Sequence, residues 1–151
     1  CCTGGIMRAF TRRSFMAFGF DIDVRTVRVA EHLGMVFGMP GSFTLQSITA
    51  ATIGSALASG TPAVVTCLSV FHRALAAGKV DEVAAIYRAC AERSLAFFVD
   101  AGSPSDASLA GSPVPWDEDG FGAWLRSVVP AGRTVRALGA TEGRTLFCVH
   151  Q

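Results

Sequence analysis

Lysine is almost absent from this sequence: Lys79 is the only one, beside twelve arginines. Charged residues make up 17% of the 151 residues, and 13 basic and 12 acidic side chains leave a formal net charge of +1. This balance lacks the broad positive surface that nucleic acids attract, so we expect no nucleic-acid partner. Intrinsic disorder is excluded too, because half of the residues are hydrophobic and disorder needs low hydrophobicity with high net charge.

Closely spaced metal ligands are also missing. The five cysteines form no CxxC pair, and no two of the three histidines stand three or four residues apart. Neither a structural zinc site nor a disulfide framework is therefore predicted, and we expect free thiols in a reducing compartment, with no metal and no cofactor. A single histidine such as His72 can ligate a haem or a chlorophyll, but a solvated histidine near a helix end is the favoured interpretation.

Charge is missing altogether between His32 and His72, over residues 33–71. A transmembrane helix needs about 20 mostly apolar residues, and residues 53–71 are the best candidate window. The sequence Gly60-Thr61-Pro62 predicts a turn inside that window. We therefore favour a buried helical core, and an integral membrane subunit with short spans between residues 33 and 71 remains the alternative.

Helical signals dominate the middle of the chain. Asp23 predicts an N-cap, and Thr61-Pro62 combines a capping residue with proline at the first helical position. The expected helices span residues 23–37, 42–59, 62–77 and 81–99, of which the last two form a central helical hairpin. The fold class predicted from these signals is mainly α, with four to five helices, an extended N-terminal arm and a small C-terminal β-hairpin.

The expected organisation has four parts. An extended basic arm covers residues 1–22, and a helical core covers residues 23–99. A linker rich in Gly, Ser and Pro follows over residues 100–116, because that composition disfavours both helix and strand. Residues 117–151 are expected to form a short helix and a β-hairpin with strands near 134–138 and 144–149.

The first twenty residues carry Arg8, Arg12 and Arg13 and no acid. An acid-free, arginine-rich start resembles a mitochondrial or plastid transit peptide, which implies an organellar location, either inside the organelle or at its membrane. Residues 11–16 also resemble a twin-arginine export signal, although charged residues follow them where an apolar segment is expected.

Two further short stretches resemble known families. Asp21-Ile22-Asp23 after an apolar run is similar to the first motif of haloacid dehalogenase-like phosphatases, but Val24-Arg25 departs from that motif. Two acids at a strand end, one of them capping a helix, are therefore the favoured interpretation. Residues 77–83 with 86–94 resemble the middle of a pentatricopeptide repeat, but no neighbouring repeat follows at the expected period of about 35 residues, so no RNA-binding role is assigned.

Catalysis has one candidate nucleophile. Cys1 paired with His72 or His150 would make a thiol–imidazole pair, as in a small cysteine-dependent hydrolase. No orienting carboxylate or amide stands beside either histidine, so an inert thiol is favoured and no catalytic residue is predicted.

The function expected from these features is a non-catalytic structural or interaction subunit that docks into a larger protein assembly, with other protein subunits as partners and a membrane as a possible one. The reason is the high apolar content, which suits buried interfaces. The residues expected to form these interfaces are Phe43, Leu45, Ile48, Val64, Leu68, Phe71, Trp116 and Trp124.

Overall fold

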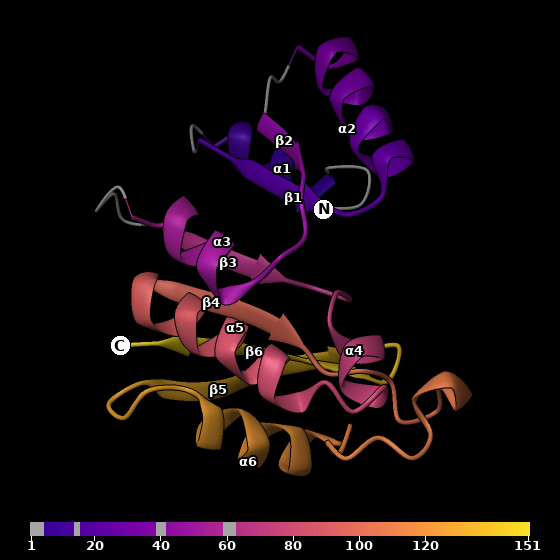
Figure 1. Cartoon of the computed structure of the whole chain (residues 1–151), viewed down its shortest axis with the longest axis vertical. Coiled ribbons are helices and arrows are strands. Elements are labelled where there is room, and N and C mark those ends of the chain that lie inside the picture. The colour runs from indigo at the N-terminus through magenta and orange to yellow at the C-terminus, as the bar shows by residue number, and fades with distance from the viewer. Residues whose placement is uncertain (1–4, 14–15, 39–41, 59–62) are drawn as a thin grey trace. The chain divides into compact units, whose positions relative to one another are not determined.

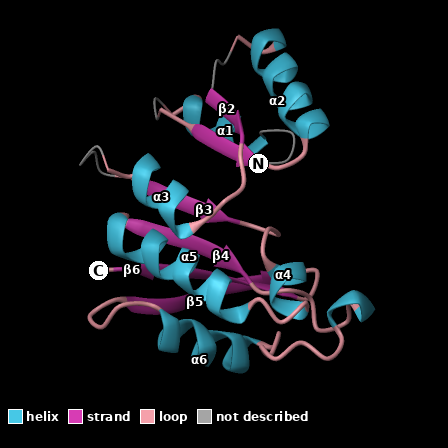
Figure 2. Ribbon diagram, in the orientation of Figure 1, coloured by secondary structure: helices cyan, strands magenta, loops and turns pink. Residues whose placement is uncertain are grey.

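The computed structural model describes residues 5–13, 16–38, 42–58 and 63–151 (Figure 1). The chain divides into two compact units, Cys1–Ile48 and Thr49–Gln151, called here the N-terminal unit and the C-terminal unit. Both units contain helices and strands (Figure 2). Each unit is therefore an α/β structure in its own right.

The N-terminal unit is a strand–helix–strand unit preceded by a short helix. Its elements are α1 (Gly5–Thr11), β1 (Phe18–Asp21), α2 (Val24–Val36) and β2 (Ser42–Leu45). The two strands pair in parallel, with Phe18 opposite Ser42 and Asp21 opposite Leu45. Parallel strands need a long crossover connection, and α2 supplies it.

Helix α2 begins where the sequence predicts it to begin. Asp23 has extended backbone angles, and its side chain accepts a hydrogen bond from the N–H of Arg25. The helix ends at Phe37, whose N–H donates to the carbonyl of Leu33, and Gly38 follows with a φ of +59°. The predicted helix over residues 23–37, with its Asp23 cap, is confirmed.

The C-terminal unit is built on a four-stranded mixed sheet. Its elements are α3 (Ala50–Ala56), β3 (Val64–Cys67), α4 (His72–Ala76), α5 (Val80–Arg93), β4 (Ala96–Asp100), the 3₁₀ helix η1 (Ala107–Leu109), α6 (Glu118–Val128), β5 (Thr134–Thr141) and β6 (Arg144–His150). The strand order is β3-β4-β6-β5. Strands β3 and β4 are parallel, and β6 is antiparallel to both of its neighbours, β4 and β5. The β5–β6 pair is the C-terminal β-hairpin that the sequence predicts.

One face of this sheet is covered by α5 and α6. Tyr87 of α5 packs edge-on against Phe97 of β4, with ring centroids 5.2 Å apart, and Phe121 of α6 contacts Phe147 of β6 at 5.5 Å. Phe147 lies directly opposite Val99, two residues after Phe97, so these side chains share a face. The core of the unit lies between this face and the two helices.

The expectation of a mainly α chain is wrong. The predicted helix 42–59 is β2 followed by α3, the predicted helix 62–77 contains β3 and α4, and the predicted helix 81–99 is α5 followed by β4. The predicted start signal at 61–62 lies outside the described residues. A buried parallel strand is a continuous apolar run, and over four residues its pattern matches one face of a helix equally well.

The extended N-terminal arm is replaced by structure in the same way, because residues 1–22 contain α1 and β1. The alternative of membrane spans between residues 33 and 71 is not supported either. Within the described ranges, no helix has the length and hydropathy needed to cross a bilayer.

Candidate functional site at the carboxyl ends of the parallel strands

Strand β1 of the N-terminal unit ends in the acidic pair that the sequence analysis singled out. Asp21 is the last residue of β1, and its carbonyl accepts a 2.9 Å hydrogen bond from the N–H of Gln46, just after β2. The Asp21 carboxylate accepts a 3.0 Å hydrogen bond from the N–H of Asp23. The first of these contacts holds the carboxyl ends of the two parallel strands beside each other, and the second orders the turn after β1.

The two acids have different structural tasks. One oxygen of Asp23 accepts from the N–H of Arg25 at 3.0 Å and the other accepts from the hydroxyl of Thr26 at 2.8 Å, so this carboxylate caps α2. Asp21 is half-buried and belongs to the strand end itself. In open α/β sheets, ligands bind outside the carboxyl ends of the strands, which makes Asp21 the candidate binding residue of this unit.

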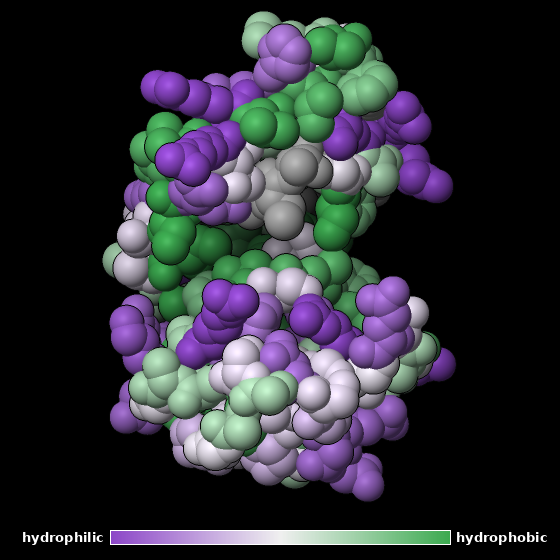
Figure 3. Space-filling view, turned by 90° about the vertical axis from the view of Figure 1, so that its right-hand side faces the viewer, coloured by the Kyte–Doolittle hydropathy of each residue, from purple (hydrophilic) through white to green (hydrophobic). Residues whose placement is uncertain are grey.

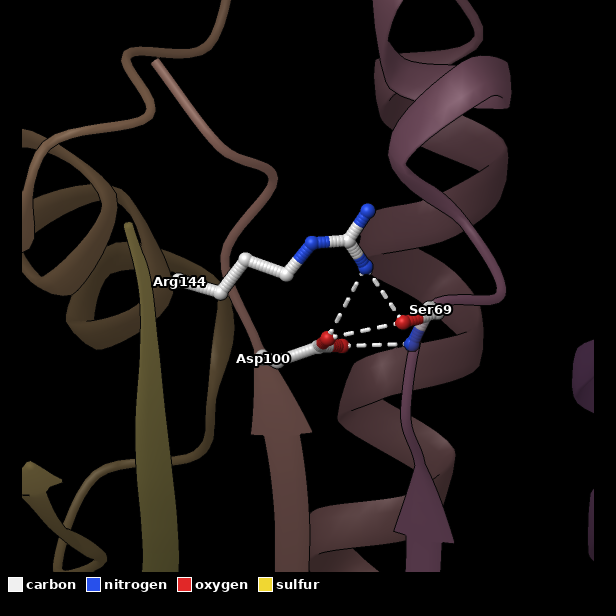
Figure 4. A network of polar contacts seen from close by, with 3 residues as sticks. All are labelled: Ser69, Asp100 and Arg144. Atoms are coloured by element: carbon white, nitrogen blue, oxygen red, sulfur yellow. Dashed lines mark hydrogen bonds and ion pairs between the residues drawn. The ribbon is translucent and has the colours of Figure 1, made fainter. Parts of the chain in front are cut away.

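The C-terminal unit carries a second polar group of residues at the carboxyl end of its own parallel pair (Figure 4). The N–H of Ser69, just after β3, donates to Asp100 Oδ1 at 2.6 Å, and the Ser69 hydroxyl donates to Asp100 Oδ2 at 3.0 Å. Arg144, the first residue of β6, donates from Nη1 to Ser69 Oγ and lies 3.6 Å from Asp100 Oδ2. We call these three residues the Ser69–Asp100–Arg144 network.

Ser69 has a strained backbone. Its φ of +54° lies in the left-handed region, which a residue with a side chain adopts at a cost of about 1–3 kcal/mol. The two hydrogen bonds to Asp100 hold the residue in this conformation. Strained backbone conformations are common at functional sites. The conformation of Ser69 is therefore a second reason to regard the loop after β3 as a candidate site.

His72 follows three residues later and opens α4. Its burial lowers the pKa of the imidazole below the ordinary value, and the nearby charge of Arg144 lowers that pKa further, while Asp100 opposes the shift. His72 is therefore neutral at pH 7. The sequence predicts His72 near the end of an apolar helix, whereas it lies in the first turn of a short one.

The cysteines of the described residues do not form a reactive or metal-binding group. Cys67 and Cys90 are buried, and a hydrogen bond between their side chains, together with burial, raises the pKa of the Cys67 thiol. A raised pKa keeps the thiol protonated and unreactive. No cluster of three His, Cys, Asp or Glu side chains suited to a metal occurs within these ranges, and Cys1 lies outside them.

Three of the predicted interface residues belong to the N-terminal unit. Leu45 at the end of β2 is exposed, and Phe43 and Ile48 are half-buried. No described contact brings them together with the acids of the site, apart from the pairing of Leu45 opposite Asp21. Their role at an interface stays a prediction.

The other five belong to the C-terminal unit and are spread over three environments. Val64 is exposed and Leu68 is half-buried, and Phe71 packs edge-on against Tyr87 at 5.7 Å. Trp116 is buried, stacks on Phe121 at 5.9 Å and donates its indole N–H to the carbonyl of Leu109, and Trp124 packs against Tyr87 at 5.7 Å. Three of the five aromatic and aliphatic side chains thus contribute to the packing of this unit, and contact with a partner stays a prediction.

The Ser69–Asp100–Arg144 network is not predicted from the sequence. Asp100 falls in the predicted linker 100–116, although it directly follows the apolar run 96–99 and so ends a buried strand. The position of Asp100 directly after this apolar run is the one signal in the sequence that points to the network. Ser69 and Arg144 are 75 residues apart, and only the placement of β6 beside β4 brings them together.

Comparison with known proteins identifies the fold. No family model and no curated protein matches the sequence. Among solved structures, the bifunctional kinase-methyltransferase WbdD matches 99% of this chain with a TM-score of 0.75 at 16% identity. The match covers 33% of the WbdD chain, so this chain spans about a third of that protein's length.

Two other methyltransferases match over the same 99% of the chain. The methyltransferase domain of bacterial CtHen1-C has a TM-score of 0.68 at 14% identity, with 85% of that chain covered. Magnesium protoporphyrin IX methyltransferase (ChlM) from Synechocystis PCC 6803, solved with bound SAM, has a TM-score of 0.64 at 16% identity, with 65% covered. These likenesses show that the chain shares the α/β fold of these methyltransferases.

The expected function is contradicted by the same neighbours. The sequence predicts a non-catalytic structural subunit, with a membrane subunit or a cysteine-dependent hydrolase as alternatives, whereas the similar structures are methyltransferases. The prediction failed because it relied on the lack of a recognisable catalytic motif. In this fold the polar residues sit at strand ends that only the folded sheet brings together.

Proposed function

We propose that this chain is part of an S-adenosylmethionine-dependent methyltransferase, with the ribose of the methyl donor held by Asp21. The observation that carries the proposal is the position of Asp21 as the last residue of β1, in a chain whose fold matches methyltransferases over 99% of its length. When bound, S-adenosylmethionine supplies a methyl group on a positively charged sulfur.

The residues around Asp21 suit a nucleoside. A carboxylate at the end of a strand in this kind of sheet accepts hydrogen bonds from ribose hydroxyls, and two oxygens allow it to accept from both hydroxyls. Ile22, directly after it, is 75% exposed, which offers an apolar surface for an adenine ring. Gln46 is exposed just after β2 and offers a side-chain amide for the edge of a base.

The C-terminal unit contributes polar groups suited to an acceptor. The Ser69–Asp100–Arg144 network and the neutral His72 lie at the carboxyl ends of β3 and β4. A neutral imidazole accepts a proton, and a guanidinium donates hydrogen bonds to an anionic or carbonyl oxygen. This unit therefore supports binding and proton transfer at a methyl-accepting group.

The experiment compares two neighbouring carboxylates. Asp21→Asn removes the charge and one acceptor oxygen at the strand end, whereas Asp23→Asn changes the helix cap to a residue that caps equally well. Binding of S-adenosylhomocysteine, measured by calorimetry on the protein that carries this chain, is expected to weaken about 10–100-fold in Asp21→Asn, as for loss of a charged hydrogen bond. Asp23→Asn is expected to bind as the unchanged protein does.

The result that overturns the proposal is equal binding by the unchanged protein and Asp21→Asn, or no binding of S-adenosylhomocysteine to the unchanged protein. Circular dichroism of both variants separates a binding defect from a folding defect. Because Asn keeps the size of Asp, the two variants are expected to give the same spectrum.

A further inference from the structure

A shallow, open cavity of about 250 Å³ lies on the surface of the β5–β6 hairpin, next to Arg144 of the Ser69–Asp100–Arg144 network. Its lining is mostly apolar and contains one charged residue, Arg144. The apolar part includes Leu138, which is 47% exposed, and Leu146, which is half-buried.

The geometry of the hairpin places these side chains on one face. Leu146 is opposite Gly139, and Arg144, two residues earlier on β6, is opposite Thr141. Alternate residues of a strand share a face, so the side chains of Arg144 and Leu146 point to the same side of the sheet. The bulge between Ala137 and Gly139 interrupts the pairing at Leu138. Bulges of this kind redirect a side chain, here one that lines the cavity.

Arg144 is only partly used by its protein partners. Its hydrogen bond to Ser69 and its ion pair with Asp100 both run through Nη1, and within the described part of the chain Nη2 and Nε have no partner. Figure 4 shows the second terminal nitrogen directed away from Ser69 and Asp100. The side chain is 30% exposed, so it is in part accessible to a ligand.

The charges around Arg144 leave room for an anion. Asp100 offsets the guanidinium on one side, and Glu142 in the hairpin turn is exposed. On the other side, Arg144 and Arg73 both lower the pKa of His72, while Asp100 and Asp106 oppose them. A guanidinium edge with two parallel N–H groups binds a carboxylate or phosphate in a bidentate manner.

We propose that the cavity on the β5–β6 hairpin binds the methyl acceptor, and that the acceptor is an anionic amphiphile whose phosphate or carboxylate contacts Arg144 and whose short apolar part contacts Leu138 and Leu146. This inference rests on the proposed function for calling the ligand an acceptor. The binding site itself rests on the cavity, the two leucines and the remaining donors of Arg144. Its volume suits a small group rather than a polymer.

The test uses probes that separate the two halves of the ligand. Hexyl phosphate and hexanoate carry both the anion and the apolar chain, hexanol carries only the chain, and inorganic phosphate carries only the charge. Binding is measured by NMR titration, following the methyl signals of Leu138 and Leu146. We expect at least one of the two charged amphiphiles to bind tenfold or more tightly than hexanol and inorganic phosphate, and to shift both leucines; the tighter of the two identifies phosphate or carboxylate.

Three variants locate the anion. Arg144→Gln is expected to weaken binding tenfold or more, whereas Arg136→Gln, at an exposed arginine on β5, is expected to leave it unchanged. Asp100→Asn removes the competing carboxylate and is expected to keep or tighten binding. If the Arg144–Asp100 ion pair only maintained the shape of the cavity, Asp100→Asn would weaken binding as Arg144→Gln does, because both partners would then be needed equally.

Arg144→Lys keeps the charge and loses the second donor edge, so it is expected to bind several-fold more weakly while remaining folded, which preserves the test if Arg144→Gln does not fold. Unchanged binding in Arg144→Lys and Arg144→Gln, equal binding of hexanol and the charged probes, or no shift at either leucine would each overturn the proposal. No methyl donor is present in these titrations. A failure of the Asp21 experiment therefore leaves them unaffected, and the two proposals fail separately.

Discussion

The two units of this chain bury their hydrophobic residues to very different degrees. In the N-terminal unit large apolar side chains are exposed on every element and in the segments between them, among them Met16 at 80%, Ile22 at 75% and Met35 at 74%. Figure 3 shows such hydrophobic side chains on the surface of this unit, and paler or hydrophilic ones over much of the C-terminal unit. In the C-terminal unit Phe121, Phe97 and Leu125 are completely buried.

The difference follows from the number of strands. Two strands and a crossover helix leave most of the sheet surface without a covering layer, whereas four strands with α5 and α6 enclose a continuous core. The C-terminal unit is therefore expected to hold most of the folding free energy of the described chain. The three predictions below test this comparison, from the largest effect to the smallest.

Truncation of the aromatic core is expected to have the largest effect. Phe121 is completely buried and packs against Trp116, Trp124 and Phe147. We expect Phe121→Ala to lower the free energy of unfolding by about 3–5 kcal/mol, because it leaves a cavity among rigid rings. Both tryptophans belong to the C-terminal unit, so urea unfolding followed by tryptophan fluorescence reports this unit.

The matched control for that prediction lies in the other unit. Met35 on α2 is 74% exposed, and we expect Met35→Ala to change the free energy of unfolding by no more than about 0.5 kcal/mol. Comparable losses in Phe121→Ala and Met35→Ala would contradict the difference between the units.

Loss of the α2 cap is expected to have an intermediate and local effect. Asp23→Ala removes the hydrogen bonds to the N–H of Arg25 and the hydroxyl of Thr26, and we expect it to destabilise α2 by about 0.5–2 kcal/mol. Amide hydrogen exchange should become faster in α2 and stay unchanged in α5. Faster exchange in both helices would mean that the two units unfold together, and Asp23→Asn, which still caps, should exchange as the unchanged protein does.

The smallest effect is expected from pH, and it belongs to the C-terminal unit. Burial and the charge of Arg144 lower the pKa of His72 in the folded state, so the unfolded chain binds the proton more readily. The resulting stability is present above the ordinary histidine pKa of 6.5 and is lost as the pH falls through the lowered pKa. His72 is half-exposed, so solvent screens its charge and keeps the change in stability smaller than in Phe121→Ala or Asp23→Ala.

Urea unfolding at pH 7.5 and pH 5.5 checks this prediction, with His72→Asn as the comparison. The unchanged protein should lose more stability over this range than His72→Asn, which has no imidazole to protonate. An equal loss in both proteins would show that other groups govern the pH dependence.

Local signals predicted the parts of the fold that depend on neighbouring residues. The Asp23 cap, the helix that follows it and the C-terminal β-hairpin are set by hydrogen bonds and pairings between residues close in the chain. The sequence predicts helices where strands β2, β3 and β4 lie, because each strand is only four or five residues long and is next to a helix in the chain. Over so few residues, helical and buried-strand patterns agree.

The candidate site residues also divide into those that the sequence indicated and those that it did not. Asp21 was found from the sequence, since an acid directly after an apolar run marks a strand end, but its role was set aside in favour of the cap at Asp23. Ser69, Asp100 and Arg144 were not found as a group. Their separations along the chain, 31 residues from Ser69 to Asp100 and 75 from Ser69 to Arg144, carry no pattern that spacing rules detect.

The sequence by itself determined the Asp23 cap, the glycine that follows α2, the C-terminal hairpin and the near-neutral charge, because each depends on residue type and local backbone preference. The tertiary structure alone decided that apolar runs pair as parallel strands, and that β6 lies between β4 and β5. That strand order brings Arg144 to Asp100 and Ser69. Strand pairing joins residues distant in the chain through backbone groups that every residue carries, so the side-chain sequence records the partners only weakly.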